Sequence, residues 1–142
     1  MADTIQSLTD SKEGIRYPLI DTHTHFDAPV FDADRAQQAQ RAYQSGVEHL
    51  VLVGYLYRHF DRLYEVKRFF DKRKVASDQA DSVDSDLVNI DARSIPTAHI
   101  ALGLHPFYID QHSQDHLDSM ADMLDQQRPL AIGAIGLDTF TP

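Results

Sequence analysis

Two histidines separated by a single residue carry the strongest chemical signal in this sequence. Residues 20–27 read Ile-Asp-Thr-His-Thr-His-Phe-Asp, so His23 and His25 stand at the end of an apolar run. Side chains two residues apart in a strand point to the same face, so both imidazoles can converge on one metal ion. A zinc-like ion would bind their neutral nitrogens at roughly 2.0–2.1 Å. The alternative is a pair of surface histidines on an edge strand, because short His-x-His matches are frequent by accident.

Two further apolar runs also end in polar residues. Residues 101–106 read Ala-Leu-Gly-Leu-His-Pro, and residues 131–138 read Ala-Ile-Gly-Ala-Ile-Gly-Leu-Asp. His105 therefore follows one strand, where Pro106 fixes the turn, and Asp138 follows the next. Three strands that end in polar side chains indicate one shared pocket. For His105, a turn histidine bonded to the backbone remains the alternative interpretation.

In this order, the three motifs resemble the TatD family of metal-dependent hydrolases, which are amidohydrolase-like TIM barrels. The resemblance runs from about Tyr17 to Thr139. It implies a divalent metal (zinc, magnesium or manganese) and hydrolysis of a phosphodiester such as DNA by a metal-activated water. It further implies that His23 and His25 bind the metal. In the family, the position of His105 lines the active site, where it would contact substrate phosphate or support the ligand shell, and Asp27 is expected to line the same pocket.

The sequence departs from the family in the fourth-strand motif. The family motif is Gly-Glu-hydrophobic-Gly-Leu-Asp, whereas residues 133–138 read Gly-Ala-Ile-Gly-Leu-Asp, so Ala134 occupies the position of a metal-binding glutamate. Asp138 is four residues further on, roughly 13 Å along an extended strand, and reaches that position only if the chain folds back. Two later histidines and an aspartate of the family have no counterpart here. We therefore expect weak metal binding and little activity from this chain alone.

The chain length limits how much of a barrel can form. The sequence has 142 residues, while a complete (β/α)8 barrel needs about 250. Alternating apolar runs and amphipathic segments predict an α/β domain over residues 17–142, equivalent to half of a TIM barrel with parallel strands. Strands are expected over 17–22, 47–54, 95–103 and 129–137, and helices over 33–45, 58–74 and 114–127. A polar tail is expected at 1–16, and an acidic loop with a short helical turn near Leu87 at 75–94.

Composition excludes several kinds of protein. The absence of cysteine rules out disulfides and thiolate metal sites. No run approaches the ~20 apolar residues that span a membrane, and residues 1–16 do not resemble a secretory signal, so a cytoplasmic setting is expected. The net charge of −9 argues against broad attraction to nucleic acid, so any contact with DNA would be local.

Other histidines offer weaker signals. His112 and His116 lie four residues apart near a helix start, a spacing that can bind zinc when both rings face one way. Without a glutamate-rich partner motif, exposed helix-start residues are the favoured interpretation. His49 and His99 lie at strand entrances and are expected to be structural, and the basic segment 58–74 is expected to be a solvated helix face.

Three functional hypotheses follow. The chain is the N-terminal half of a TatD-like deoxyribonuclease with little activity of its own, or a split barrel completed by another chain. The third hypothesis is a non-enzymatic binding module that kept the pocket and lost the metal. In an isolated four-strand unit the edge strands would leave apolar side chains uncovered, which predicts either a self-associating chain or a loosely packed, aggregation-prone monomer. These side chains are Leu19, Ile20, Ile132 and Ile135. A complementary C-terminal half is the other partner considered.

Overall fold

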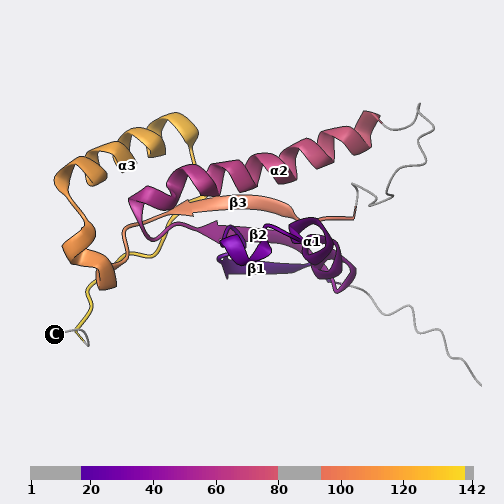
Figure 1. The fold of residues 1–142 in the computed structure, drawn as a ribbon, viewed down its shortest axis with the longest axis horizontal. Helices are drawn as coiled ribbons and strands as arrows, with labels where there is room; N and C mark the ends of the chain where they lie inside the picture. The colour runs from indigo at the N-terminus through magenta and orange to yellow at the C-terminus, as the bar shows by residue number, and fades with distance from the viewer. Residues whose placement is uncertain (1–16, 80–93, 140–142) are drawn as a thin grey trace, which may run out of the picture.

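Parallel strands alternate with helices along the chain. The computed structural model describes residues 17–79 and 94–139, and the structural statements below concern these residues. The elements are β1 (Leu19–Thr24), α1 (Arg35–Gln44), β2 (Val47–Val53), α2 (Phe60–Gln79), β3 (Thr97–Leu102), α3 (Gln114–Gln127) and β4 (Ala131–Ile132). The strands pair in the order β1-β2-β3-β4, all parallel. This arrangement is half of a TIM barrel, which confirms the expected fold class (Figure 1).

One face of the sheet is packed against the helices. In β2, the alternate residues Leu50 and Leu52 point to this face, and their partners on β3 are Ala98 and Ile100. Phe60, Leu63, Val66 and Phe70 of α2 pack on them, at the near-helical spacing that marks one side of a helix. Figure 1 shows α2 running along the length of the sheet. The apolar core of the domain therefore lies between α2 and the sheet.

The opposite face of the sheet carries smaller and more polar side chains. Val51 and Val53 of β2 and Ala101 of β3 form a small cluster there, and Ala134 packs against it. His49 and His99 share this face nearer the strand entrances, and Nδ1 of His49 lies 3.1 Å from Nε2 of His99. The two imidazoles therefore form a hydrogen bond with each other.

Two elements differ from the expected boundaries by more than two residues at one end. Helix α2 continues to Gln79, so the acidic loop expected at 75–94 does not begin at 75. Residues 80–93, which include the turn expected near Leu87, lie outside the described residues, and so does the expected tail 1–16. Strand β4 has only two residues instead of the nine expected over 129–137. Ala134 has a φ of 57° and Gly136 a φ of 136°, and such angles are incompatible with an extended strand. The chain therefore leaves the sheet soon after Ile132.

The helices of the described segments are α1, α2 and α3, together with three short 3-10 helices. None of them combines the length and the apolar character that crossing a bilayer requires.

Candidate metal and substrate site

A register shift in β1 decides which way the two histidines point. Asp21 pairs with Leu50, but Thr24 pairs with Leu52, so three steps along β1 match two along β2. Without the extra residue, His23 would lie beside Leu52 on the helix-packed face; such irregularities re-aim side chains. The Asp21 carboxylate accepts a hydrogen bond of 3.1 Å from the His23 backbone N–H within the shifted segment. The two histidines are consequently turned to the face opposite the helices.

His23 and His25 converge on one cavity, which we call the histidine cavity. Their ring centroids are 5.4 Å apart at an interplanar angle of 86°. That separation is short enough for one nitrogen of each ring to reach the same ion at about 2.0–2.1 Å. The cavity has a volume of about 370 Å³ and is lined by His23, His25, Tyr55, His105, Phe107, Tyr108 and Ala134. The convergence expected from the spacing is present in the geometry, and metal binding itself stays a prediction.

The fourth-strand motif reaches this cavity through a close approach of two glycines. Gly103 follows β3 and Gly133 follows β4, and a Cβ on Gly103 would stand 1.3 Å from the carbonyl oxygen of Gly133. Only glycine permits this contact, which brings the next residue, Ala134, to the cavity wall. The position that holds a glutamate in the resembling family thus faces the two histidines. Here it contributes a methyl group instead of a carboxylate.

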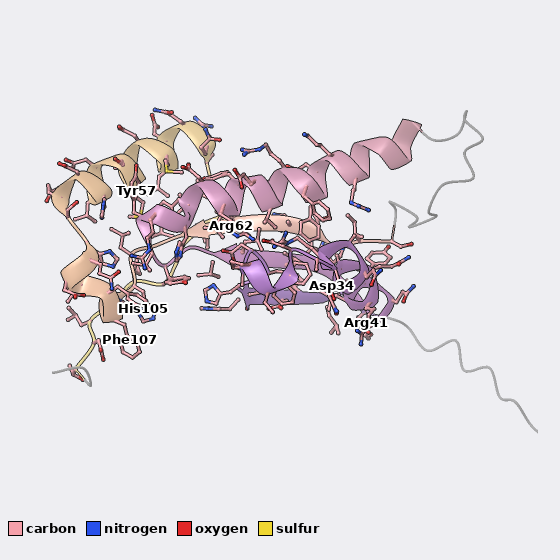
Figure 2. The ribbon with its side chains drawn as sticks, in the orientation of Figure 1. Asp34, Arg41, Tyr57, Arg62, His105 and Phe107 are labelled. Carbon is pink, nitrogen blue, oxygen red and sulfur yellow. The ribbon has the colours of Figure 1, made fainter. Side chains whose placement is uncertain are left out.

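His105 is held so that its hydrogen-bonding role is defined. Nδ1 accepts a hydrogen bond of 3.1 Å from the Phe107 N–H, so the ring's proton resides on Nε2. The His105 N–H donates to the Tyr55 carbonyl at 3.0 Å, which ties the ends of β2 and β3 together. Figure 2 shows His105 and Phe107 beside each other at one end of the molecule. With Nε2 protonated, His105 is suited to donate to an anionic oxygen and not to ligate a metal.

Tyr55 is a cavity residue that the sequence reasoning missed. Its ring centroid is 5.1 Å from that of His25 and 5.6 Å from that of Tyr108. Burial, and then the nearby Tyr108 and Asp27, raise the pKa of its phenol, so the hydroxyl stays protonated and able to donate. Tyr55 follows β2 by two residues, and the rule that parallel strand ends meet at one edge would have identified it.

Asp27 is buried instead of lining the cavity. Only 6% of its surface is exposed, and its Oδ1 atom has no hydrogen-bond partner among the described residues. Its charge helps to raise the pKa of Tyr55. It also acts to raise the pKa of His59, but burial and then the nearby Arg58 outweigh it and lower that pKa. Asp27 therefore acts on the site through its charge and not as part of the cavity wall.

Two arginines hold the turn that follows His25. Arg35 of α1 donates to the carbonyl oxygens of Phe26 at 3.2 Å and of Ala28 at 3.2 Å. Arg62 of α2 donates to the carbonyl of Asp27, and both guanidiniums also bind the Asp32 carboxylate. Figure 2 shows Arg62 at the centre of the molecule, over the sheet. These bonds fix the end of the histidine motif to α1 and α2, the two helices that follow it in the chain.

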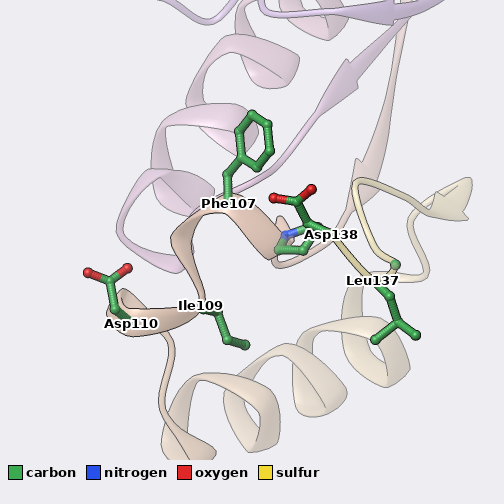
Figure 3. Close-up of a pocket in the computed structure, with 7 residues that line it drawn as sticks. Phe107, Ile109, Asp110, Leu137 and Asp138 are labelled. Atoms are coloured by element: carbon green, nitrogen blue, oxygen red, sulfur yellow. The ribbon is translucent and has the colours of Figure 1, made fainter. Parts of the chain in front are cut away.

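Asp138 lies in a second cavity, beside the first. This cavity has a volume of about 520 Å³ and lies between the loop after His105 and the segment after β4. Its lining residues are Pro106, Phe107, Ile109, Asp110, Gly136, Leu137 and Asp138, as Figure 3 shows. Asp138 therefore does not line the histidine cavity and does not take the place of the missing glutamate.

His112 and His116 do not form a helical pair. Helix α3 begins at Gln114, with Ser113 as its N-cap, so His112 lies before the helix with a φ of −95° and a ψ of 147°. The His116 ring stacks on Tyr57 with centroids 4.7 Å apart, while Nε2 of His112 lies 2.9 Å from the His105 carbonyl. The zinc-binding arrangement that the spacing permits is absent, because the two side chains serve separate contacts.

The described residues supply only part of a metal site. Among residues 17–79 and 94–139, no group of three or more histidine, aspartate, glutamate or cysteine side chains is arranged to hold one ion. His23 and His25 fit a borderline dication as a pair of neutral imidazoles. The remaining wall of the cavity is aromatic, apart from His105 and Ala134.

Comparisons with known proteins point to one family of metal-dependent hydrolases. The family profile described as TatD related DNase matches residues 20–142. An Escherichia coli K12 protein named uncharacterized metal-dependent hydrolase YjjV is 29% identical over 124 residues, which are 86% of this chain and 38% of that protein. A Geobacillus stearothermophilus protein, named uncharacterized metal-dependent hydrolase in metS 3'region, is 40% identical over 48 residues, 34% of this chain and 98% of that protein.

A solved structure matches the fold as well. The crystal structure of YjjV, described as a TatD homologue from Escherichia coli K12, superposes with a TM-score of 0.62 at 30% identity, over 86% of this chain and 38% of that one. The chain thus spans well under half the length of this relative.

Proposed function

Because the chain belongs to the TatD family of metal-dependent hydrolases, we propose that it supplies the first half of a hydrolase site, in which His23 and His25 bind a divalent metal. The observation that carries this proposal is the meeting of three motifs at one cavity: the histidine pair at the end of β1, His105 after β3 and Ala134 after β4. Barrels of this kind perform their chemistry at the rim where the strand ends converge.

The reaction class we propose is hydrolysis of a phosphodiester, with DNA as the substrate suggested by the family description. A bound dication would activate water and stabilise negative charge on the phosphoryl oxygens. Beside it, His105 would donate its Nε2 proton in a hydrogen bond to a substrate oxygen, and the protonated Tyr55 hydroxyl would offer a second donor. The net charge of −9 favours a short local contact with the substrate over broad attraction to a nucleic acid.

Ala134 is the reason to expect weak metal binding by this chain. A carboxylate at this position of the cavity wall would supply a third metal ligand beside His23 and His25. Alanine and glutamate carry similar backbone strain at a φ of 57°, since both have a Cβ, so the substitution tests the ligand and not the backbone.

Isothermal titration of zinc and of manganese tests this proposal. We expect His23→Ala and His25→Ala each to abolish measurable binding, and Ala134→Glu to tighten it by about 10-fold or more, because an anionic ligand favours any hard or borderline dication. His116→Ala is the matched control, since that imidazole stacks on Tyr57 away from the cavity. Equal affinities of the wild-type and Ala134→Glu chains would contradict the assignment of position 134.

A second candidate is a barrel completed by another chain, either a second copy or a complementary half. Four apolar side chains on or beside the edge strands are more than half exposed: Leu19 at 54%, Ile20 at 58%, Ile132 at 54% and Ile135 at 61%. Exposed apolar edges promote association. Light scattering after size-exclusion chromatography distinguishes the two candidates. Association that is weakened by Ile132→Lys but not by Ile109→Lys favours the completed barrel. Ile109→Lys is the control, because Ile109 is exposed on the 3-10 helix, away from the strands. A monomer unaffected by Ile132→Lys would contradict it.

A further inference from the structure

A single loop contributes three of the seven residues that line the histidine cavity. This loop, residues 105–112, contains the 3-10 helix Pro106–Gln111 and provides His105, Phe107 and Tyr108 to the cavity. The rings of His105 and Phe107 have centroids 5.0 Å apart, and those of His105 and Tyr108 are 6.1 Å apart. The shape of this loop therefore sets a large part of the cavity wall.

The two ends of the loop are joined by one side chain. Nε2 of His112 lies 2.9 Å from the carbonyl oxygen of His105. Since a carbonyl only accepts, Nε2 of His112 must carry the proton and donate. Nδ1 of the same ring is buried without a hydrogen-bond partner among the described residues, so a proton there would be a buried, unpaired donor. The contacts thus select one tautomer of His112, the one that donates to His105.

The carbonyl of His105 is a shared acceptor that organises the loop. It receives the backbone N–H of Tyr108 at 3.0 Å in addition to the His112 ring. In the same residue, Nδ1 receives the Phe107 N–H, and this bond orients the imidazole that lines the cavity. A second tie, from Arg58 to the Gln111 side chain at 2.9 Å, joins the loop to the segment before α2, but both partners are exposed.

From these contacts we infer that His112 is a positioning residue: it closes the loop 105–112 onto the His105 carbonyl and so holds the His105 ring, with Nε2 protonated, against the cavity. The inference deepens the proposed function and rests on it for the role of the cavity as a phosphate site. The closing contact itself is independent of any metal or substrate. A failure of the positioning role of His112 can therefore be distinguished from a failure of the proposed function.

Nuclear magnetic resonance of the histidine ring nitrogens in the full 142-residue chain provides the test. We expect the wild-type chain to show His105 as the Nε2-protonated tautomer, and His112→Ala to show a mixture of tautomers with faster exchange of the ring proton. His112→Gln should restore the wild-type pattern, because the glutamine amide nitrogen occupies nearly the position of the histidine Nε2 and donates. His112→Asn should not restore it, because its amide is too short to reach the carbonyl. His116→Ala is the control for loss of a neighbouring imidazole.

A titration with dimethyl phosphate, a minimal phosphodiester, gives the second measurement. His112→Ala should weaken its binding by about 10-fold, and His112→Gln should return most of that affinity, as expected for one hydrogen bond that orients a donor. If the His105 tautomer is the same in the wild-type and His112→Ala chains, the inference is wrong. If the tautomer changes as expected but dimethyl phosphate does not bind the wild-type chain, the positioning role stands and the proposed phosphate site is wrong.

Discussion

The two faces of the sheet differ in what their side chains do. The face under α2 carries Leu52 and Leu102, both fully buried, and meets the fully buried Leu63 and Phe70 of the helix. The opposite face carries a cluster of three small residues, a hydrogen-bonded histidine pair and the histidine cavity. Adjacent residues of the same strand therefore serve different purposes. Stability is concentrated on the helix-packed face, and the groups suited to chemistry lie on the other.

This separation has a physical origin in the strand geometry. Side chains alternate between faces, so β2 and β3 supply apolar side chains to both sides. Within residues 17–79 and 94–139, only one side is covered by a long helix, α2. A polar site can then form at the strand ends, on the side of the sheet away from the apolar core. Substitutions at neighbouring positions are the most direct test of the comparison.

The largest contrast is expected between two adjacent residues of β2. Leu52→Ala should lower the free energy of unfolding by about 2–5 kcal/mol, because it leaves a cavity among large apolar side chains. Val53→Ala should lower it by about 1–2 kcal/mol, the value for removing two methyl groups from a small cluster. Urea denaturation of both variants measures the difference. Equal losses would mean that the two faces contribute equally to stability.

A smaller effect, confined to the site, is expected at the contact between the two motif glycines. Gly103→Ala places a methyl group where the Gly133 carbonyl stands, so the segment after β4 must move away from β3. We expect a stability loss of about 1–3 kcal/mol, typical of overpacking, with the core between α2 and the sheet intact. Metal affinity should fall in the Gly103→Ala, Ala134→Glu double variant relative to Ala134→Glu alone. Unchanged affinity in the double variant would show that the contact does not set the position of residue 134.

The smallest effect concerns the arginines that hold the turn after His25. The hydrogen bond from Arg35, and with it Arg62, lowers the pKa of Asp32 below its ordinary value of 3.8. A lowered pKa in the folded state means that the ionised carboxylate stabilises the fold above pH 3.8, and that this contribution is lost as the pH falls through the folded-state pKa. Asp32→Asn should therefore be slightly less stable than the wild type at pH 7, and the difference should shrink below pH 3.8. A difference that stays constant in urea titrations at pH 7 and pH 3 would contradict this assignment.

Much of the fold follows from local patterns that the sequence displays. The near-continuous apolar run of β2 and the helical spacing of Phe60, Leu63 and Phe70 predict their elements because burial and periodicity are local properties. The predictions were less accurate where the backbone leaves regular geometry. The fourth strand was expected over 129–137, but positive φ angles at Ala134 and Gly136 end it early. Alanine gives no sequence signal for such an angle.

The candidate site likewise contains residues that local patterns predict and contacts that they do not. The alternation of side chains in a strand predicts that His23 and His25 share a face, and the positions after the strands place His105 and Ala134 near them. The strand-end rule also applies to Tyr55, which lies two residues after β2. The closing contact of His112 lies outside any such pattern, because it depends on which backbone carbonyl the ring meets after folding.

The sequence by itself therefore determined the family, the strand and helix order and the pairing of the two histidines, because these depend on residue types and short-range spacing. Only the tertiary structure decided which face the histidines occupy, since that depends on the one-residue register shift between β1 and β2. It also decided that Asp138 lies in a separate cavity, because the chain turns after β4. Register and turns are set by contacts between distant segments, which no local pattern specifies.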